Sequence, residues 1–129
     1  MRKIKFRGKR YDSEKWIYGN LVDDDVILTR GCLCVDDDYI GFDDDWSSVK
    51  PETVGQFTGL LDGNGKEIYE GDILQFEEYP PAQVLWYDGA FNARRLDIND
   101  DYILADWYDG TVIIGNIHDN PELAEGIEL

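Results

Sequence analysis

The chain has 129 residues, of which 43% are hydrophobic and 31% are charged, a composition typical of a globular domain that can bury a core. Its 28 Asp and Glu outnumber 12 Lys and Arg, so the formal net charge is −16, and such a surface disfavours a nucleic-acid partner. No apolar run is long enough to span a membrane, and two Cys (Cys32 and Cys34) are too few for a disulfide framework, which suits a reducing cytoplasm.

The first 15 residues differ in charge from the rest of the chain. They hold seven bases and two acids, a net charge of +5, whereas the other 114 residues have a net charge of −21. Alternation in RKIKFR predicts a strand that places Lys3, Lys5 and Arg7 on one face. The segment KWIYGNLV is predicted to return beside it, with Trp16 and Tyr18 sharing one side.

Three Asp triplets follow, at residues 23–25, 36–38 and 43–45. Asp competes for nearby backbone donors, so the triplets predict turns around the short strands VILT and CLCV. A joint Ca²⁺ site is the alternative, but no Gly and Glu have the spacing of a calcium loop, so solvated turns are favoured. Cys32 and Cys34 share a strand face, yet a structural zinc site usually needs four N or S ligands. No metal-binding residues are therefore predicted.

The central segment TGLLDGNGKEIYEGDIL contains four glycines between apolar runs. A phosphate loop needs Lys-Ser or Lys-Thr after its last Gly, but here Lys66 is followed by Glu67. A calcium loop beginning at Asp62 would place Lys66 where a ligand oxygen belongs. We therefore predict that this segment turns strands and that no cofactor binds to it.

Two further strand pairs are predicted around Asp-Gly dipeptides, the strongest short hairpin signal. AQVLWY and AFNARRL flank the first, and YILADWY and TVIIGNI flank the second. The predicted structural turns are Asn64, Gly65, Gly71, Asp72, Asp88, Gly89, Asp109 and Gly110. Only the end of the chain predicts helix, with Asn120 as N-cap and Gly126 as the stop.

These patterns predict a mostly β protein. Residues 1–50 are expected to form a small N-terminal β lobe with acidic loops, and residues 51–129 an SH3-like antiparallel barrel with a short C-terminal helix. A thin barrel fills its interior with large side chains, so most of the aromatic residues are expected in the core and some at a partner interface. The aromatic set is Trp16, Tyr18, Trp46, Trp86, Tyr87, Trp107 and Tyr108.

Three segments resemble the YopX family of phage and prophage proteins. They are TVGQFTGLLDGNGKEIYEGDIL (53–74), IIGNIHDNPEL (113–123) and IKFRGKRYDSEKWIYGNLV (4–22), and together they cover roughly half of the chain. The resemblance implies a phage-encoded, mostly β protein that self-associates in the cytoplasm of the bacterial host. It supplies no catalytic residues, because the family's biochemical function is not established.

Three classes of function stay open. The favoured one is an accessory interaction protein that forms a homo-oligomer. The alternatives are an acidic DNA-mimicking decoy that binds a basic host protein, and a nucleic-acid-binding module that uses the basic N-terminal strand. An enzyme is the least favoured, because no nucleophile, base and orienting residue are recognisable around the one His, His118. The expected subunit or partner contacts are Lys3, Lys5, Arg7, Trp16, Tyr18, Asp43, Asp44 and Asp45.

Overall fold

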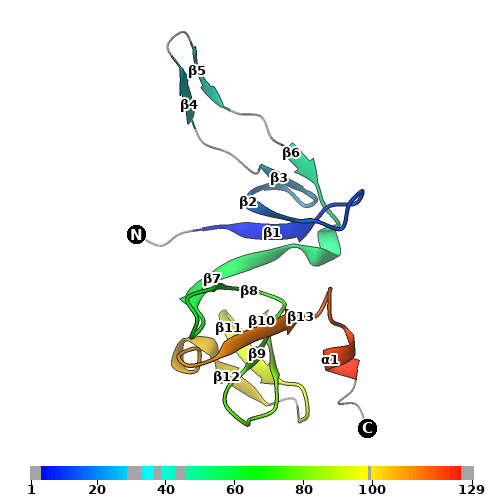
Figure 1. Cartoon of the computed structure of the whole chain (residues 1–129), viewed down its shortest axis with the longest axis vertical. Coiled ribbons are helices and arrows are strands. Elements are labelled where there is room, and N and C mark those ends of the chain that lie inside the picture. Colours follow the sequence, from blue (N-terminus) through cyan, green and yellow to red (C-terminus); the bar gives the residue numbers. More distant parts are fainter. Residues whose placement is uncertain (1–3, 29–32, 37–38, 43–45, 99, 126–129) are drawn as a thin grey trace. The chain divides into compact units, whose positions relative to one another are not determined.

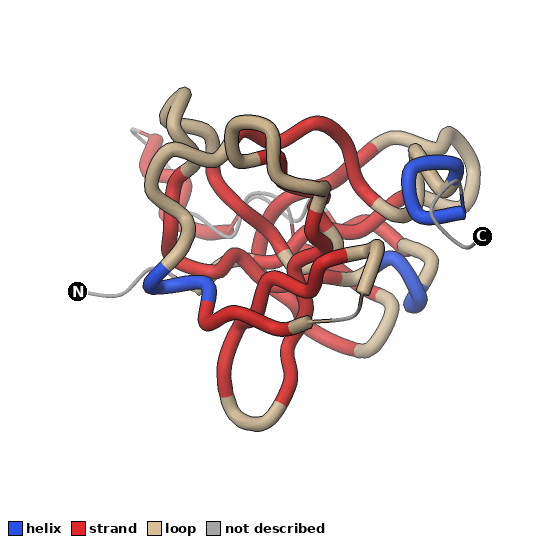
Figure 2. Tube along the Cα trace, turned by 90° about the horizontal axis from the view of Figure 1, so that it is seen from below, coloured by secondary structure: helices blue, strands red, loops and turns tan. Residues whose placement is uncertain are grey.

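The computed structural model of the chain describes residues 4–28, 33–36, 39–42, 46–98 and 100–125. These residues are mostly β-strand, which confirms the prediction of a mostly β protein (Figure 1). Helix is confined to short segments, as the strand-dominated trace of Figure 2 shows. The chain divides into two compact units between Gln56 and Phe57.

The first unit is an antiparallel sheet with strand order β6-β3-β2-β1, followed by the first residues of β7. Its elements are β1 (Phe6–Lys9), β2 (Trp16–Asp23), β3 (Val26–Leu28), β4 (Leu33–Asp36), β5 (Tyr39–Phe42), β6 (Trp46–Ser48) and the 3₁₀ turn η1 (Pro51–Thr53). β4 and β5 pair with each other as a separate two-stranded sheet. The predicted return of the chain beside its first strand is confirmed, because β2 pairs with β1.

A close approach at Gly8 fixes how the first unit packs. A Cβ at Gly8 would lie 2.8 Å from Val49 Cγ2 and 3.3 Å from Ile27 Cδ1, so this position on β1 has no room for a side chain. Both neighbours are fully buried. The hydroxyl of Thr53 links β1 to the turn after β6. It accepts the N–H of Lys9 at 2.8 Å and donates to the carbonyl oxygen of Lys50 at 2.6 Å.

The second unit contains a five-stranded antiparallel sheet with order β12-β11-β10-β9-β13, beside the hairpin of β7 and β8. Its elements are β7 (Gly55–Leu61), which begins in the first unit, β8 (Glu67–Tyr69), β9 (Asp72–Gln75), β10 (Ala82–Tyr87), β11 (Ala90–Arg95), β12 (Asp101–Ile103), the 3₁₀ turn η2 (Leu104–Asp106), β13 (Val112–Asn116) and α1 (Glu122–Glu125). The predicted hairpins around Asn64-Gly65 and Asp88-Gly89 both form, as β7–β8 and β10–β11.

The closed SH3-like barrel predicted for this unit is not confirmed. β12 and β13 are the two outer strands of the five-stranded sheet, and no pairing joins them in the part of the chain that the structure describes. Asp109 and Gly110 do lie in a turn, but β12 pairs with β11 and β13 pairs with β9, so the expected second hairpin does not form. The physical reason is that η2 interrupts YILADWY after Ile103 and leaves a strand of only three residues.

The predicted C-terminal helix is also not confirmed, because α1 is a single turn of four residues. Asn120 was expected to cap it with its side chain. Instead, Asn120 Oδ1 accepts the N–H of Asn116 at 3.2 Å, and its backbone carbonyl accepts the N–H of Leu123 at 3.0 Å. Among the described residues, no helical segment has the length and apolar character needed to cross a bilayer.

Small and aliphatic side chains fill the core of the second unit. The cluster consists of Ile68, Leu74, Ala82, Val84, Ala93 and Leu104, each fully buried. The expectation that most of the aromatic set lies in the core is therefore wrong: Tyr18, Trp86 and Tyr87 are 42%, 53% and 55% exposed. Trp107 and Tyr108 are partly buried against the cluster. Among the described residues, the rings buried in this unit are those of Phe57 and Tyr69, which are 6% and 2% exposed with centroids 5.5 Å apart, and neither belongs to the predicted aromatic set.

Candidate interaction surfaces

The carboxylate of Asp62 organises the central glycine-rich turn. It is 6% exposed, and its Oδ1 accepts the N–H groups of Asn64 (2.8 Å) and Lys66 (2.9 Å). Its Oδ2 accepts the N–H of Ile113 on β13 at 3.0 Å. Burial acts to raise the pKa of Asp62, but these backbone donors outweigh burial and hold the pKa below its ordinary value. The carboxylate therefore binds the protein's own backbone, a role that the sequence analysis missed although Asp before a Gly-rich turn is a known signal.

The other predicted turn residues that have a positive φ or a buried side chain also shape the backbone of their turns. Gly65, Gly71, Gly89 and Gly110 have φ angles of +81°, +96°, +80° and +90°. Asp72 is 1% exposed, and its Oδ2 accepts the N–H of Tyr69 at 2.7 Å. Asp88 has a φ of +54° beside Gly89, so both central residues of the β10–β11 turn are left-handed, as in a type I′ hairpin.

His118 lies in the turn that follows β13. Its backbone N–H donates to Asn116 Oδ1 at 3.0 Å, and the N–H of Asp119 donates to the same oxygen at 2.8 Å. Asn116 thus shapes this turn as Asp62 shapes the central one. Within the described ranges, no group of three or more His, Cys, Asp and Glu side chains is placed to hold a metal ion.

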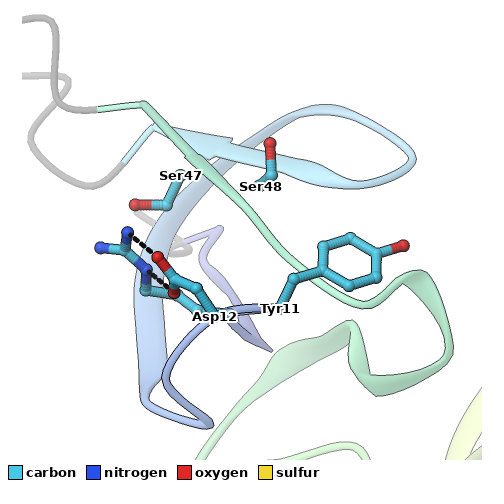
Figure 3. Close-up of a pocket in the computed structure, with 5 residues that line it drawn as sticks. Tyr11, Asp12, Ser47 and Ser48 are labelled. Atoms are coloured by element: carbon cyan, nitrogen blue, oxygen red, sulfur yellow. Dashed lines mark hydrogen bonds and ion pairs between the residues drawn. The ribbon is translucent and has the colours of Figure 1, made fainter.

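A polar pocket of about 320 Å³ lies in the first unit (Figure 3). It is lined by Arg10, Tyr11, Asp12, Ser47 and Ser48. Arg10 donates two hydrogen bonds to the carboxylate of Asp12, from Nε to Oδ1 at 2.9 Å and from Nη2 to Oδ2 at 3.0 Å. The guanidinium of Arg10 thereby lowers the pKa of Asp12. Figure 3 shows Ser47 beside the ion pair, whereas the ring of Tyr11 points away. A carboxylate with a lowered pKa is a weak base, so Asp12 is a poor partner for activating a serine.

Basic side chains on β1, and that of Lys5 just before it, lie over aromatic rings of β2. The guanidinium carbon of Arg7 is 4.5 Å from the ring centroid of Trp16, and Lys5 Nζ is 5.8 Å from that of Tyr18. Arg7 is only 6% exposed, so its guanidinium offers little surface to another molecule. Lys3, Asp43, Asp44 and Asp45 lie outside the described residues.

A second pocket, of about 260 Å³, lies in the second unit and is lined by aromatic rings. Its lining residues are Phe76, Tyr79, Arg95, Tyr102 and Trp107, which we call the aromatic groove. The rings form a row: the centroids of Tyr79 and Phe76 are 5.7 Å apart, those of Phe76 and Trp107 5.9 Å, and those of Trp107 and Tyr102 5.8 Å. The two outer contacts are stacked, with interplanar angles of 24° and 10°.

Hydrogen bonds donated by side chains hold both ends of the aromatic groove. Gln75 Nε2 donates to the carbonyl oxygen of Tyr79 at 2.6 Å, which fixes the loop after β9. At the other end, Arg95 Nε and Nη2 bind the two oxygens of Asp97 at 3.0 and 2.6 Å. Side-chain hydrogen bonds to Asp97 and Tyr102 raise the pKa of Arg95, so the guanidinium stays charged. Of the groove residues, only Trp107 belongs to the aromatic set predicted from the sequence, because the others come from separate segments that only folding brings together.

The model of the YopX protein family matches residues 5–125 of the chain. The chain belongs to the YopX family. Protein EF1440 from Enterococcus faecalis, known from its crystal structure, is similar to this YopX-family chain, with a TM-score of 0.66 and 27% sequence identity. The similarity covers 96% of this chain and 99% of that one. No protein with a curated description matches the chain.

Proposed function

We propose that this YopX-family chain is a phage- or prophage-encoded accessory protein that acts by binding macromolecules and that assembles with copies of itself. The observation that supports this best is the exposure of two large aromatic side chains on β10, Trp86 at 53% and Tyr87 at 55%. Trp and Tyr are the side chains most often found as energetic anchors in protein interfaces. Trp86 and Tyr87 occupy consecutive positions at the end of a strand, so their side chains point to opposite faces of the sheet, and each exposed ring favours contact with another protein on its own face.

The surroundings of these two rings favour a preformed surface. Trp86 packs edge-on against Phe91, with centroids 4.9 Å apart. The guanidinium of Arg94 lies 5.3 Å from the centroid of Tyr87, and Arg94 is itself held by Asp101 through bonds of 2.6 and 2.9 Å. Because these contacts already restrict the rings, binding a partner costs them little conformational entropy.

Light scattering on the purified chain at about 0.15 M salt tests the assembly, since the screening length there is near 8 Å. We expect an oligomer that the double variant Trp86→Ala, Tyr87→Ala shifts toward smaller species. Tyr11→Ala is the matched control, because Tyr11 is 57% exposed but lies in the first unit. A monomer at high protein concentration would contradict self-association, and an unchanged oligomer in the double variant would contradict the choice of surface.

Charge supports a second contact within the same assembly. The +5 of residues 1–15 and the −21 of the remaining chain are complementary between two copies. Of the predicted contacts Lys3, Lys5 and Arg7, the described Lys5 is partly exposed whereas Arg7 is buried, so we propose that Lys5, together with Lys3, faces acidic surface of a neighbouring copy. Raising the salt to about 0.5 M should then weaken assembly, since screening acts on exposed charge pairs.

A second candidate function is the acidic decoy, and the charge of the second unit favours it. Residues 57–129 hold 16 Asp and Glu against three Lys and Arg, a net charge of −13. Such a surface attracts basic DNA-binding proteins. The chain should then displace labelled duplex DNA from a basic host DNA-binding protein, with steep salt dependence. Failure to compete at low salt would exclude this function.

A further inference from the structure

We propose that the aromatic groove binds proline-rich peptide segments that carry Lys or Arg next to the prolines. The groove and the exposed pair on β10 share no residue. This peptide site therefore does not rest on self-association. Four features of the groove support it: the row of rings, the polar groups among them, the preformed backbone and the charge of the rim.

The row of rings matches the shape of an extended proline-rich chain. The three centroid separations of 5.7, 5.9 and 5.8 Å give the row a length of at most about 17 Å. A polyproline II helix rises about 3.1 Å per residue, so this length accommodates about five residues. A groove lined by aromatic rings suits the pyrrolidine rings of such a helix, as in other aromatic-lined grooves.

The polar groups of the groove are mostly hydrogen-bond donors. Trp107 contributes an indole N–H, Arg95 the guanidinium N–H groups that do not bind Asp97, and Tyr79 and Tyr102 hydroxyl groups, which can donate. Proline has a carbonyl oxygen but no backbone N–H, so a proline-rich segment presents acceptors and few donors. A helix would bring its own satisfied backbone, and a non-proline extended strand would bring N–H groups that need acceptors. The polar chemistry of the groove therefore favours proline.

The groove is preformed, which reduces the entropy lost on binding. Besides the bond from Gln75 Nε2 to Tyr79, the loop holds Glu77 at a φ of +50°, a conformation that non-glycine residues seldom adopt. Gly110 supports the other side: a Cβ there would lie 3.0 Å from Phe76 Cε2. The ring of Phe76 is thus packed directly against backbone.

Charge around the groove selects the flanks of the peptide. Glu77 and Glu78 are exposed and line, with Tyr79, an open hollow of about 480 Å³ that adjoins the groove. Asp106, also exposed, directly precedes Trp107. Arg95 is the one base of the groove, and Asp97 neutralises it. This rim attracts Lys and Arg, and it repels the phosphates of single-stranded nucleic acid, which could otherwise stack on the rings.

Fluorescence anisotropy with short labelled probes tests the proposal. The main probe is the peptide KPPPPPPK, and the comparison probes are EPPPPPPE, a Lys-flanked Gly-Ser peptide of equal length, and an eight-nucleotide oligo-dT. We expect saturable binding of the Lys-flanked proline peptide, at least tenfold tighter than any comparison probe. Stronger binding of oligo-dT would overturn the proposal in favour of base stacking, and equal binding of the Glu-flanked peptide would overturn the role of the rim.

Two sets of variants locate the site. Tyr79→Ala should weaken binding of KPPPPPPK at least tenfold, and Tyr79→Phe, which keeps the ring, should restore most of it. Tyr11→Ala is the matched control, because Tyr11 and Tyr79 are 57% and 55% exposed. Glu77→Gln with Glu78→Gln should weaken binding less than Tyr79→Ala and should reduce its salt dependence. Binding that Tyr79→Ala leaves unchanged, in a variant with native circular dichroism, would overturn the assignment of the groove.

Discussion

The two units of the chain bury different kinds of side chain. In the first unit, the described aliphatic residues that are fully buried are Ile27 and Val49, whereas Arg7 and Lys9 are only 6% and 8% exposed. Both cations lie over the ring of Trp16, at 4.5 and 5.8 Å from its centroid, so their hydrocarbon stems share the interior with an aromatic face. The second unit instead buries a contiguous aliphatic cluster around Leu74.

The two units also differ in what lowers the pKa of their carboxylates. In the first unit, hydrogen bonds from Lys50 and then Lys9 lower the pKa of Glu14, which is an exposed side chain. In the second unit, the pKa of Asp62 is lowered by backbone N–H groups although the side chain is buried. Exposed ion pairs contribute little to stability, whereas a buried acceptor of several backbone bonds contributes much more. Acid sensitivity should therefore lie mainly in the second unit.

The units also differ in charge, and this bears on binding. Residues 1–56 hold 12 acids and nine bases, a net charge of −3, against −13 for residues 57–129. Both groups of exposed aromatic residues proposed as contacts, the β10 pair and the aromatic groove, belong to the more acidic unit. We therefore expect basic partners to bind the second unit. In the first unit, bases such as Arg7 and Lys9 already contact aromatic and acidic side chains of the same unit.

The largest expected effect tests the difference between the cores. Leu74→Ala should lower the free energy of unfolding by about 3 kcal/mol, because it leaves a cavity in the contiguous cluster. Val49→Ala in the first unit removes less hydrocarbon and should cost about 2 kcal/mol. Urea denaturation followed by circular dichroism measures both, with Val112→Ala, at a site 39% exposed, as the control. If Val49→Ala lowered the free energy of unfolding more than Leu74→Ala, the core of the first unit would be the more important for stability.

The next effect concerns the two kinds of carboxylate. Asp62→Asn should destabilise the protein by about 2 kcal/mol at pH 7, because the amide group cannot accept the N–H of Ile113 and Oδ1 loses its charge. Since the folded-state pKa of Asp62 is lowered, its contribution is complete above the unfolded-state value of about 4 and is lost as the pH falls through the lower folded-state pKa.

Urea curves from pH 7 to pH 2 check this prediction. The gap in stability between the natural protein and Asp62→Asn should narrow below about pH 4. Asp12→Asn is the control from the first unit, and it should leave the curves nearly unchanged, since Asp12 is paired at the surface. A gap that stays constant down to pH 2 would show that the charge of Asp62 is not what stabilises the turn.

A smaller effect is expected at Gly65. Its φ is +81° and a Cβ there would meet no atom within 4 Å, so Gly65→Ala should cost about 1 kcal/mol for conformational reasons alone. Gly65→Asn should cost less, because Asn tolerates the left-handed region. Thermal unfolding of the two variants gives the comparison. A phosphate or nucleotide that bound this loop, and was lost in Gly65→Ala without loss of stability, would contradict the architectural role of the turn.

The smallest expected effect is the absence of a gel shift. Labelled single- and double-stranded DNA at low salt should not be retarded by the purified chain, because the net charge of −16 opposes the approach of phosphate. A robust shift that Lys5→Glu abolishes would exclude the decoy and support a binding module built on the N-terminal strand. The outcome would also reassign the main binding surface from the second unit to the first.

Much of the fold follows from local signals in the sequence. Alternation with a polar turn predicted the pairing of β1 with β2, and Asp88-Gly89 predicted the β10–β11 hairpin, because such dipeptides adopt the positive φ angles that a tight hairpin needs. The family also followed from sequence, since YopX-like blocks occur near both ends and in the centre. In each case the decisive information lies within a few neighbouring residues or in an uninterrupted block.

The tertiary structure decided what depends on distant segments. Asp62 accepts from a strand 51 residues away, and β12 and β13 lie at opposite edges of a sheet although a turn signal stands between them. The aromatic groove likewise assembles rings from the loop after β9, from β12 and from the residue after η2. Local sequence patterns predicted most of the strands, the tight turns and the family. Which strands became edges, and which rings met, depended on the competition of long-range pairings for the same backbone groups, which no local pattern encodes.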